Sequence, residues 1–323
     1  MNHNPVLAVL KERFGAFVSG EELGRHAGVS RTAIWKRINH IRSLGYGIES
    51  STRRGYRLVK VTGKLIPEEV GWGLNTATVG RSILHYDEVA STNEEAKRLA
   101  IEGAEDGAVL IAEEQTGGRG RLGRGWISPR GGIWLSVILR PRIAPSDGPK
   151  VMMLAASSVF ATLRSAGLAA SIKWPNDIIV GGKKVCGILT EMASQPEIVD
   201  HIIVGIGLNA NISLELFSTD IRACATSLEA ELGHPVERLK LVQGLLQGLD
   251  VRYAGLKKGN FDSIVGEWRG ACGTIGQEIE LSTASGTVGG LAVGVDGCGA
   301  IVLRLSDGSE RAFSAGEVTV VKR

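Results

Sequence analysis

The feature that most constrains this chain is the run of residues 116–126, TGGRGRLGRGW, in which glycines alternate with arginines. Glycine tolerates positive φ and lets the backbone approach a ligand closely, and successive backbone N–H groups in such turns can cradle an anion. Guanidinium groups add bidentate hydrogen bonds to carboxylate or phosphate. The run therefore predicts a loop that binds a substrate with several negative charges. A flexible, solvated basic loop is the alternative, and the apolar segments that flank the run disfavour it.

The neighbours of this loop exclude two nucleotide-binding folds. Gly118, Gly120 and Gly123 match the G-x-G-x-x-G pattern and follow an apolar strand at residues 108–112. A dinucleotide-binding site requires a helix directly after that pattern, but residues 133–139 read as a second apolar strand. No Gly-Lys-Ser/Thr sequence closes the loop as in a Walker P-loop. We expect instead a loop that connects two strands.

Positive charge is concentrated near the N-terminus. Residues 1–60 carry eleven Lys or Arg and four Asp or Glu, a net charge of +7, whereas the remaining residues sum to −4. A basic head on a mildly acidic body indicates that the head binds nucleic acid.

The head has the pattern of a winged helix-turn-helix domain. Ser19 and Ser30 are placed to cap two helices that flank a Gly-Val turn, and two strands at residues 45–49 and 55–59 follow. A protein-interaction module is the alternative, but the positive charge at the second helix and at the hairpin tip favours DNA. Trp35 could instead belong to the core. The candidate DNA-binding residues are Ser30, Arg31, Thr32, Trp35, Lys36, Arg53 and Arg54.

Composition indicates a soluble globular protein. Its 323 residues are 43% hydrophobic and 22% charged, which suits two or three domains. No apolar run approaches the length of a membrane span, and the first residues lack the regions of a signal peptide. The four cysteines form no C-x-x-C pair, which predicts free thiols, no zinc site and a cytoplasmic location.

The pattern predicts an α+β chain in three parts. A linker at residues 63–80 follows the head at 1–62, and a mixed-sheet α/β domain at 81–272 follows the linker. In that domain Ser91 and Glu94 fit a capping box for a helix to residue 101, and Gly181-Gly182 fits a hairpin turn. From residue 273, short strands at 277–281, 286–288, 291–295, 300–305 and 316–320 predict a small antiparallel barrel of the SH3 type.

Five motifs in this order resemble the biotin–protein ligase family. They are Ser91-Thr92-Asn93, Gln115 with residues 117–126, residues 173–177 (KWPND), residues 184–189 (KVCGIL) and residues 205–209 (GIGLN). With the winged head, the chain is similar over essentially its whole length to members of this family that also repress the biotin operon.

The resemblance implies a reaction, cofactors and partners. Biotin is activated with ATP and Mg²⁺ to biotinyl-5′-adenylate and is then transferred to a lysine of a biotin carboxyl carrier protein. The adenylate-bound homodimer represses biotin-synthesis genes at an operator. The alternatives are a ligase whose head does not regulate, a transcription factor with an inactive ligand-sensing domain, and a lipoate-type ligase.

The resemblance also implies roles for individual residues. Arg121 and Lys184 are expected at the biotin carboxylate and the α-phosphate, and Asp177 either orients or deprotonates the incoming lysine or is a structural acceptor. Lys183, on the opposite face of its strand, is expected in solvent. No protein side chain is expected to bind the metal. The implied biotin-binding residues are Ser91, Thr92, Asn93, Gln115, Gly118, Arg119, Gly120, Arg121, Lys184, Gly187 and Gly205. The implied ATP- or adenylate-binding residues are Arg119, Arg121, Arg124, Trp126, Asn176, Lys184 and Asn209, the last at the adenine edge or a phosphate.

Overall fold

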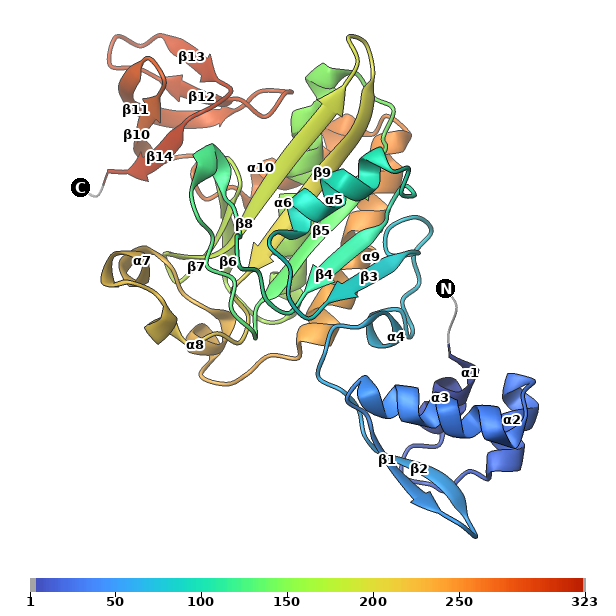
Figure 1. The fold of residues 1–323 in the computed structure, drawn as a ribbon. Helices are drawn as coiled ribbons and strands as arrows, with labels where there is room; N and C mark the ends of the chain where they lie inside the picture. The colour runs from blue at the N-terminus through green and yellow to red at the C-terminus, as the bar shows by residue number, and fades with distance from the viewer. Residues whose placement is uncertain (1–3, 322–323) are drawn as a thin grey trace. The chain divides into compact units, whose positions relative to one another are not determined.

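The computed structural model describes residues 4–321, and its contacts divide the chain at Gly73 into two compact units. Figure 1 shows the elements of each unit in chain order. None of the helices within residues 4–321 is long and apolar enough to cross a membrane.

The first unit is the predicted winged helix-turn-helix. The Ser19 hydroxyl accepts from the backbone N–H of Glu22, and the Ser30 hydroxyl accepts from that of Ala33, so both predicted caps are confirmed. The buried face of the third helix contains three isoleucines, Ile34, Ile38 and Ile41. Its elements are α1 (Pro5–Glu12), α2 (Gly20–Ala27), α3 (Arg31–Ser43), β1 (Gly47–Ser51), β2 (Gly55–Lys60) and α4 (Pro67–Val70).

This unit extends past the predicted boundary at residue 62. The short helix α4 lies in the predicted linker, yet its Glu69 is buried and lies 2.8 Å from the Lys11 ammonium. The Tyr46 hydroxyl donates to the same carboxylate. Burial, together with that hydrogen bond, raises the pKa of the Tyr46 phenol. These contacts tie α4 to the head, so a buried charge network replaces the first half of the predicted linker.

The second unit contains a seven-stranded mixed sheet in the order β3-β4-β5-β9-β8-β7-β6. Only the β3–β4 pair is parallel. The predicted hairpin across Gly181-Gly182 is formed by β7 and β8, and residues 174–176 turn the chain between β6 and β7. The strands are β3 (Ile83–Tyr86), β4 (Val109–Ala112), β5 (Ile133–Leu139), β6 (Ala170–Lys173), β7 (Asp177–Val180), β8 (Lys183–Ser194) and β9 (Val199–Leu208).

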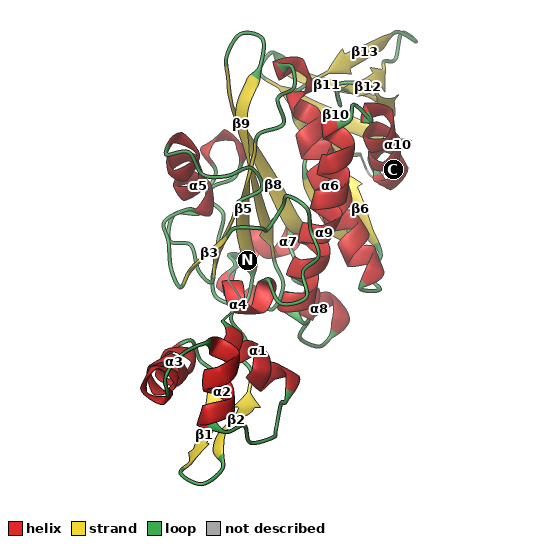
Figure 2. Cartoon of the chain, turned by 90° about the vertical axis from the view of Figure 1, so that its right-hand side faces the viewer, coloured by secondary structure: helices red, strands yellow, loops and turns green. Residues whose placement is uncertain are grey.

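Helices cover both faces of this sheet, as Figure 2 shows: α6 and α9 on one side and α5 on the other. The carboxylate of Asp250 on α9 accepts three backbone N–H groups of residues 77–79, each at 2.8 Å, and so holds the start of the unit. The helices are α5 (Thr92–Ile101), α6 (Gly148–Ser165), α7 (Thr219–Cys224), α8 (Leu228–Leu232), α9 (Arg238–Lys257) and α10 (Phe261–Ala271), with 3-10 turns η1 (Arg121–Gly123), η2 (Pro145–Asp147) and η3 (Leu214–Leu216).

The C-terminal part is a five-stranded antiparallel sheet in the order β13-β12-β11-β10-β14. The prediction of two strands separated by a turn at Gly289-Gly290 is wrong, because β11 runs unbroken through both glycines. A Cβ on Gly290 would lie 2.6 Å from the Arg304 carbonyl oxygen, so this glycine permits close strand approach instead of a turn. The strands are β10 (Glu278–Thr283), β11 (Gly286–Val295), β12 (Ile301–Arg304), β13 (Glu310–Phe313), which was not predicted, and β14 (Glu317–Val320).

Candidate active site

A cavity of about 390 Å³ opens between the Gly-Arg loop and the sheet. Its walls come from the start of α5, the β6–β7 turn, β8, β9, α7 and the start of β14. Every residue predicted for the ligase site except Gly118 lines it: Ser91, Thr92, Asn93, Gln115, Arg119, Gly120, Arg121, Arg124, Trp126, Asn176, Asp177, Lys184, Gly187, Gly205 and Asn209. Segments that lie far apart in the sequence therefore converge on one hollow.

Gly118 has a structural role that was not predicted. A Cβ at this position would lie 2.4 Å from the Trp126 carbonyl oxygen and 2.7 Å from the Ser128 hydroxyl. The glycine lets the loop fold onto itself, and its expected contact with biotin stays a prediction.

The Gly-Arg loop is a folded hairpin. The backbone N–H of Gly120 donates to the Arg124 carbonyl at 2.7 Å, and that of Trp126 donates to the Gly118 carbonyl at 2.9 Å. At its tip Leu122 has a φ of 57°, a left-handed conformation that side chains with a Cβ rarely adopt. Leu122 is also 83% exposed. The tip thus combines backbone strain with an exposed apolar side chain.

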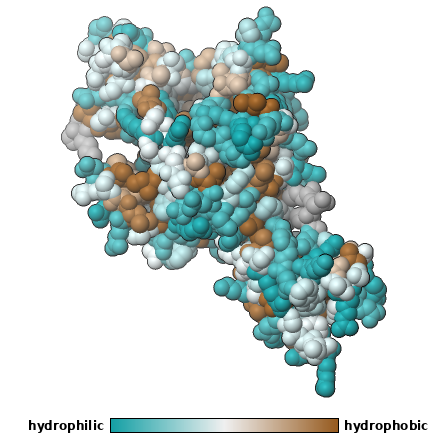
Figure 3. Space-filling view, in the orientation of Figure 1, coloured by the Kyte–Doolittle hydropathy of each residue, from teal (hydrophilic) through white to brown (hydrophobic). Residues whose placement is uncertain are grey.

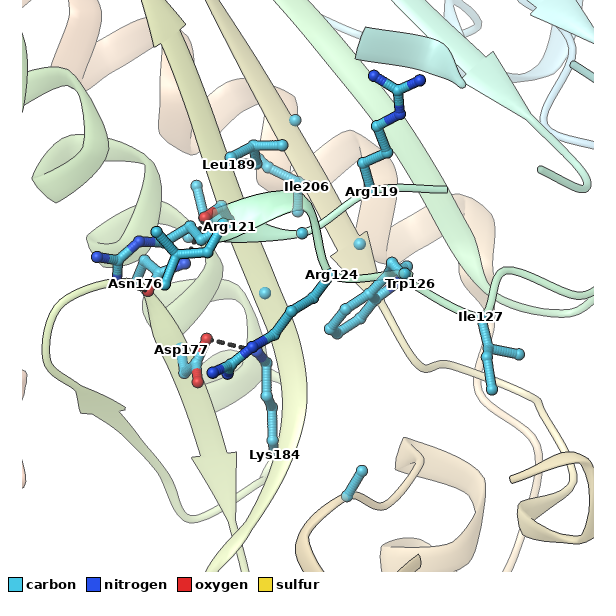
Figure 4. A pocket seen from close by; sticks show the side chains of 18 of the residues that line it. Arg119, Arg121, Arg124, Trp126, Ile127, Asn176, Asp177, Lys184, Leu189 and Ile206 are labelled. Atoms are coloured by element: carbon cyan, nitrogen blue, oxygen red, sulfur yellow. Dashed lines mark hydrogen bonds and ion pairs between the residues drawn. The ribbon is translucent and has the colours of Figure 1, made fainter. Parts of the chain in front are cut away.

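Five cationic side chains line this site, and three of them, Lys184, Arg119 and Arg124, are paired with carboxylates. Lys184 lies 2.7 Å from Asp177 and, as predicted, enters the site where Lys183 does not. Arg124 donates to Glu317 of β14 at 2.7 Å, and this hydrogen bond lowers the pKa of the Glu317 carboxyl. Figure 4 shows Arg124 extended toward Asp177 and Lys184.

The remaining two arginines differ from each other. Arg119 is exposed, points away from the Asp177–Lys184 pair in Figure 4, and lies 3.2 Å from Glu94. Arg121 donates to the neutral side-chain oxygen of Asn176 at 3.1 Å and makes no salt bridge within the described part of the chain. Among the residues described, neither Arg121 nor Lys173, which also lines the cavity, thus forms an ion pair with a carboxylate of the site.

Glycines on neighbouring strands form a floor under Trp126. Gly187 of β8 pairs with Gly207 of β9. A Cβ on Gly187 would lie 3.0 Å from the indole, and one on Gly207 would lie 2.6 Å from Nε1. The Lys184 ammonium lies 5.0 Å from the ring centroid. These glycines make room for the aromatic ring, and the role of Gly207 was not predicted.

Gly205 of β9 makes room for the side chain of Asn93. A Cβ there would lie 2.1 Å from the side-chain oxygen of Asn93. Gly205 thus makes room for the Asn93 amide and also lines the cavity, so its contact with biotin stays a prediction. Asn93 itself donates to Glu191 at 2.8 Å.

The start of α5 meets the loop through a fixed amide. The backbone N–H of Thr92 donates to Gln115 Oε1 at 2.8 Å, and Gln115 Nε2 donates to the Ser128 hydroxyl at 2.9 Å. Because a backbone N–H only donates, the orientation of the Gln115 amide is determined. The Ser91 side chain makes no capping hydrogen bond, so the predicted capping box is wrong and its hydroxyl lines the cavity.

Two buried polar atoms in the cavity wall have no partner among residues 4–321. Asn209 Nδ2 donates to the Thr226 carbonyl at 2.9 Å, which leaves Oδ1 as an unpaired acceptor. Trp126 Nε1 is an unpaired donor. Buried polar groups are nearly always hydrogen-bonded, so both atoms indicate a ligand.

Sequence reasoning missed part of the wall. Helix α7 and the residues before it contribute Phe217, Ile221 and Cys224, and the C-terminal sheet contributes Glu317. Figure 3 shows apolar side chains over the α7 region on the face of the molecule drawn in Figure 1. The N-cap hydroxyl of Ser218, which accepts from Ile221, was the available signal for α7.

The seven candidate DNA-binding residues of the first unit are all exposed. Trp35 is 56% exposed, so the alternative that it belongs to the core is wrong. The Arg54 guanidinium lies 4.1 Å from the centroid of the Phe17 ring, which holds it at the hairpin tip.

Family models match three segments of the chain. They are the HTH domain at residues 3–57, the Biotin/lipoate A/B protein ligase family at 87–209, and the Biotin protein ligase C terminal domain at 274–321. The chain therefore belongs to the biotin protein ligase family, as the motifs predicted.

Individual relatives narrow this assignment. The bifunctional ligase/repressor BirA of Bacillus spizizenii is 38% identical over 301 residues, 93% of each chain. The biotin–[acetyl-CoA-carboxylase] ligase of Paracoccus denitrificans is 33% identical over 66% of this chain and 90% of its own length. The solved biotin protein ligase from Aquifex aeolicus in complex with biotin and ATP matches with a TM-score of 0.66 and 29% identity, over 75% of this chain and 100% of that one. The similarity to the bifunctional ligase/repressor thus includes the head.

Proposed function

We propose that this protein activates biotin with ATP, transfers it to a lysine of a biotin carboxyl carrier protein, and represses biotin-synthesis genes. A biotin carboxylate oxygen attacks the α-phosphorus of ATP, and pyrophosphate leaves. The amine of the carrier lysine then attacks the carbonyl carbon of the adenylate, forming an amide and releasing AMP and a proton. The observation that carries the proposal is one cavity in which Arg121 and Lys184 face the same glycine-floored hollow.

The first step brings two anions together, so cations must offset their repulsion and the charge that develops in the transition state. Arg121 suits this role because no carboxylate of the site pairs with it. Lys184 is held 2.7 Å from Asp177, which supports a positioning role for that carboxylate. A role of Asp177 in orienting or deprotonating the incoming lysine is the alternative.

The adenine is proposed to stack on Trp126, and its amino group is proposed to donate a hydrogen bond to Asn209 Oδ1. The unpaired atom of Asn209 is an acceptor, which supports the adenine edge over a phosphate. Arg124 is proposed to bind the triphosphate, and its pair with Glu317 must then be exchanged for the ligand.

Biotin is proposed to place its ureido group against Ser91, Thr92 and Gln115. These side chains line the cavity where the start of α5 meets the residue that precedes the Gly-Arg loop. The apolar body of biotin then extends along the cavity wall at Gly187 and Gly205.

Mg²⁺ is proposed to arrive with the phosphates of ATP and to neutralise the departing pyrophosphate. Within residues 4–321 no group of three or more His, Cys, Asp or Glu side chains is arranged to hold a metal ion. The cationic side chains of this cavity suit phosphate oxygens.

The head is proposed to bind a palindromic operator when adenylate promotes a homodimer in the cytoplasm. The exposed Arg31, Trp35 and Lys36 at the start of α3 support major-groove binding. Arg53 and Arg54 at the wing tip support backbone contacts.

Biotin-dependent exchange of labelled pyrophosphate into ATP tests the ligase proposal. Exchange with lipoate and none with biotin would refute it in favour of a lipoate-type ligase. Gel shifts on the biotin-synthesis promoter, with and without biotin plus ATP, test the repressor. Binding that is indifferent to the ligands would indicate a head that does not regulate.

A further inference from the structure

A fully buried hydroxyl lies directly behind the polar end of the cavity. Ser136 of β5 is 0% exposed and does not line the hollow. Its Oγ lies 2.8 Å from Thr92 Oγ1 and 2.6 Å from Asn93 Oδ1. Both partners line the cavity, so Ser136 acts on its wall without reaching a ligand.

The direction of one of these hydrogen bonds is determined. Asn93 Nδ2 lies 2.8 Å from the carboxylate of Glu191, and that carboxylate lies 2.6 Å from the Lys97 ammonium. A charged carboxylate only accepts, so the amide nitrogen must face Glu191 and the oxygen must face Ser136. Ser136 therefore donates its single proton to Asn93.

At the other end of this hydrogen-bond network, Gln115 Oε1 is a second acceptor for the Thr92 hydroxyl proton. Thr92 Oγ1 lies 3.0 Å from Gln115 Oε1, which the backbone N–H of Thr92 identifies as the amide oxygen. Three oxygen–oxygen contacts thus join Asn93, Ser136, Thr92 and Gln115, but the two hydroxyls supply only two protons. If Thr92 donated to Gln115, the Thr92 and Ser136 oxygens would face each other at 2.8 Å with no proton between them. If Thr92 donates to Ser136, the contact without a proton is the longer one, 3.0 Å between Thr92 Oγ1 and Gln115 Oε1.

We propose that Ser136 is a positioning residue that draws the Thr92 hydroxyl proton inward. With that proton directed at Ser136, Thr92 Oγ1 and Gln115 Oε1 both keep lone pairs for a ligand. The polar end of the cavity then accepts hydrogen bonds from N–H groups such as those of a cyclic urea. The inference rests on the proposed function of the cavity as a biotin site.

Ser136→Ala tests this role through pyrophosphate exchange in the full chain. Without the Ser136 oxygen, Thr92 turns its proton to Gln115 and the wall loses an acceptor. The KM for biotin should rise about 5- to 10-fold, while the KM for ATP and kcat stay within about twofold. Ser157→Ala is the matched control, because Ser157 is equally buried and its hydroxyl has no partner. That control should leave the KM for biotin unchanged.

A double-mutant cycle separates positioning from packing. Thr92→Val removes the hydroxyl through which Ser136 acts, so adding Ser136→Ala to it should raise the KM for biotin no further. Multiplying effects, equal rises in both KM values, or an unchanged KM for biotin would overturn the inference. If Ser136→Ala does not fold, Ser136→Cys, whose thiol is a weaker donor and acceptor, should show the same selective rise. Absence of biotin-dependent exchange in the parent protein would instead refute the proposed function, and this inference with it.

Discussion

Glu317→Gln should strengthen ATP binding, because the native carboxylate occupies the arginine proposed for the triphosphate. Arg124 donates to Glu317 at 2.7 Å, so ATP must displace this partner. A glutamine keeps the shape of the side chain and removes its charge. The substitution therefore isolates the competition between carboxylate and phosphate.

The size of the effect follows from exposure. The Arg124 and Glu317 side chains are 63% and 51% exposed, so solvent screens the pair strongly. Exposed ion pairs contribute about 0.2–1 kcal/mol, which corresponds to about a 1.4- to 5-fold fall in the KM for ATP. The pKa of Glu317 lies below its ordinary value of 4.5 because of the Arg124 hydrogen bond. The ion pair is intact above that ordinary value and is lost as pH falls through the lowered pKa, so the effect should be constant between about pH 6 and 8.

Pyrophosphate exchange at varied ATP concentration measures this effect. Glu310→Gln is the matched control, since the Arg304–Glu310 pair belongs to the same C-terminal sheet and has nearly equal exposure, 52% and 49%. It does not line the cavity and should leave the KM for ATP unchanged. A higher KM for ATP in Glu317→Gln would show that the carboxylate assists the nucleotide, and the reasoning would be refuted. An equal fall in the KM for ATP in both variants would show that the effect comes from the change in net charge alone.

Three further predictions follow from the same contacts. Arg121→Ala should lower kcat/KM for exchange by about 10²–10³-fold, whereas Arg119→Ala should cost about tenfold or less, since Arg119 is exposed and paired with Glu94; equal losses would contradict this ranking. Trp35→Ala should weaken operator binding in gel shifts and leave exchange unchanged, while Phe14→Ala, also 56% exposed in the same unit, should alter neither. EDTA should abolish exchange and added Mg²⁺ should restore it, and exchange that persists in excess EDTA would exclude a required divalent cation.

Local hydrogen bonds are the part of this fold that the sequence predicts well. A capping hydroxyl and the N–H three residues later are fixed by the helix itself, and the caps at Ser19 and Ser30 form as expected. Ser91 has the same local pattern but makes no such bond. Its neighbours Thr92 and Asn93 bond to β5 and to Gln115 instead, so tertiary partners override the local preference.

The glycines also show that tertiary neighbours are harder to predict from the sequence than local structure. Each of the glycines on β8 and β9 accommodates a close neighbour, but the identity of that neighbour depends on segments far away in the sequence. Asn93 fills the space at Gly205, and Trp126 fills the space at Gly187 and Gly207. At Gly290 the neighbour is a backbone carbonyl of β12, which made a strand interior look like a turn.

Most of the charged side chains in the cavity already form ion pairs with one another or with neighbouring residues. Lys184, Arg119 and Arg124 each contact a carboxylate, so binding of an anion at these positions exchanges one ion pair for another and gains less than the bare charge suggests. Arg121 differs, because its partner is the neutral Asn176 and the exchange releases no carboxylate. Of the three arginines at the site, Arg121 is therefore expected to bind the first anion. Arg124 contacts Glu317, and Arg121 contacts the Gly316 carbonyl. An anion that binds these arginines is therefore expected to change their contacts with the C-terminal sheet.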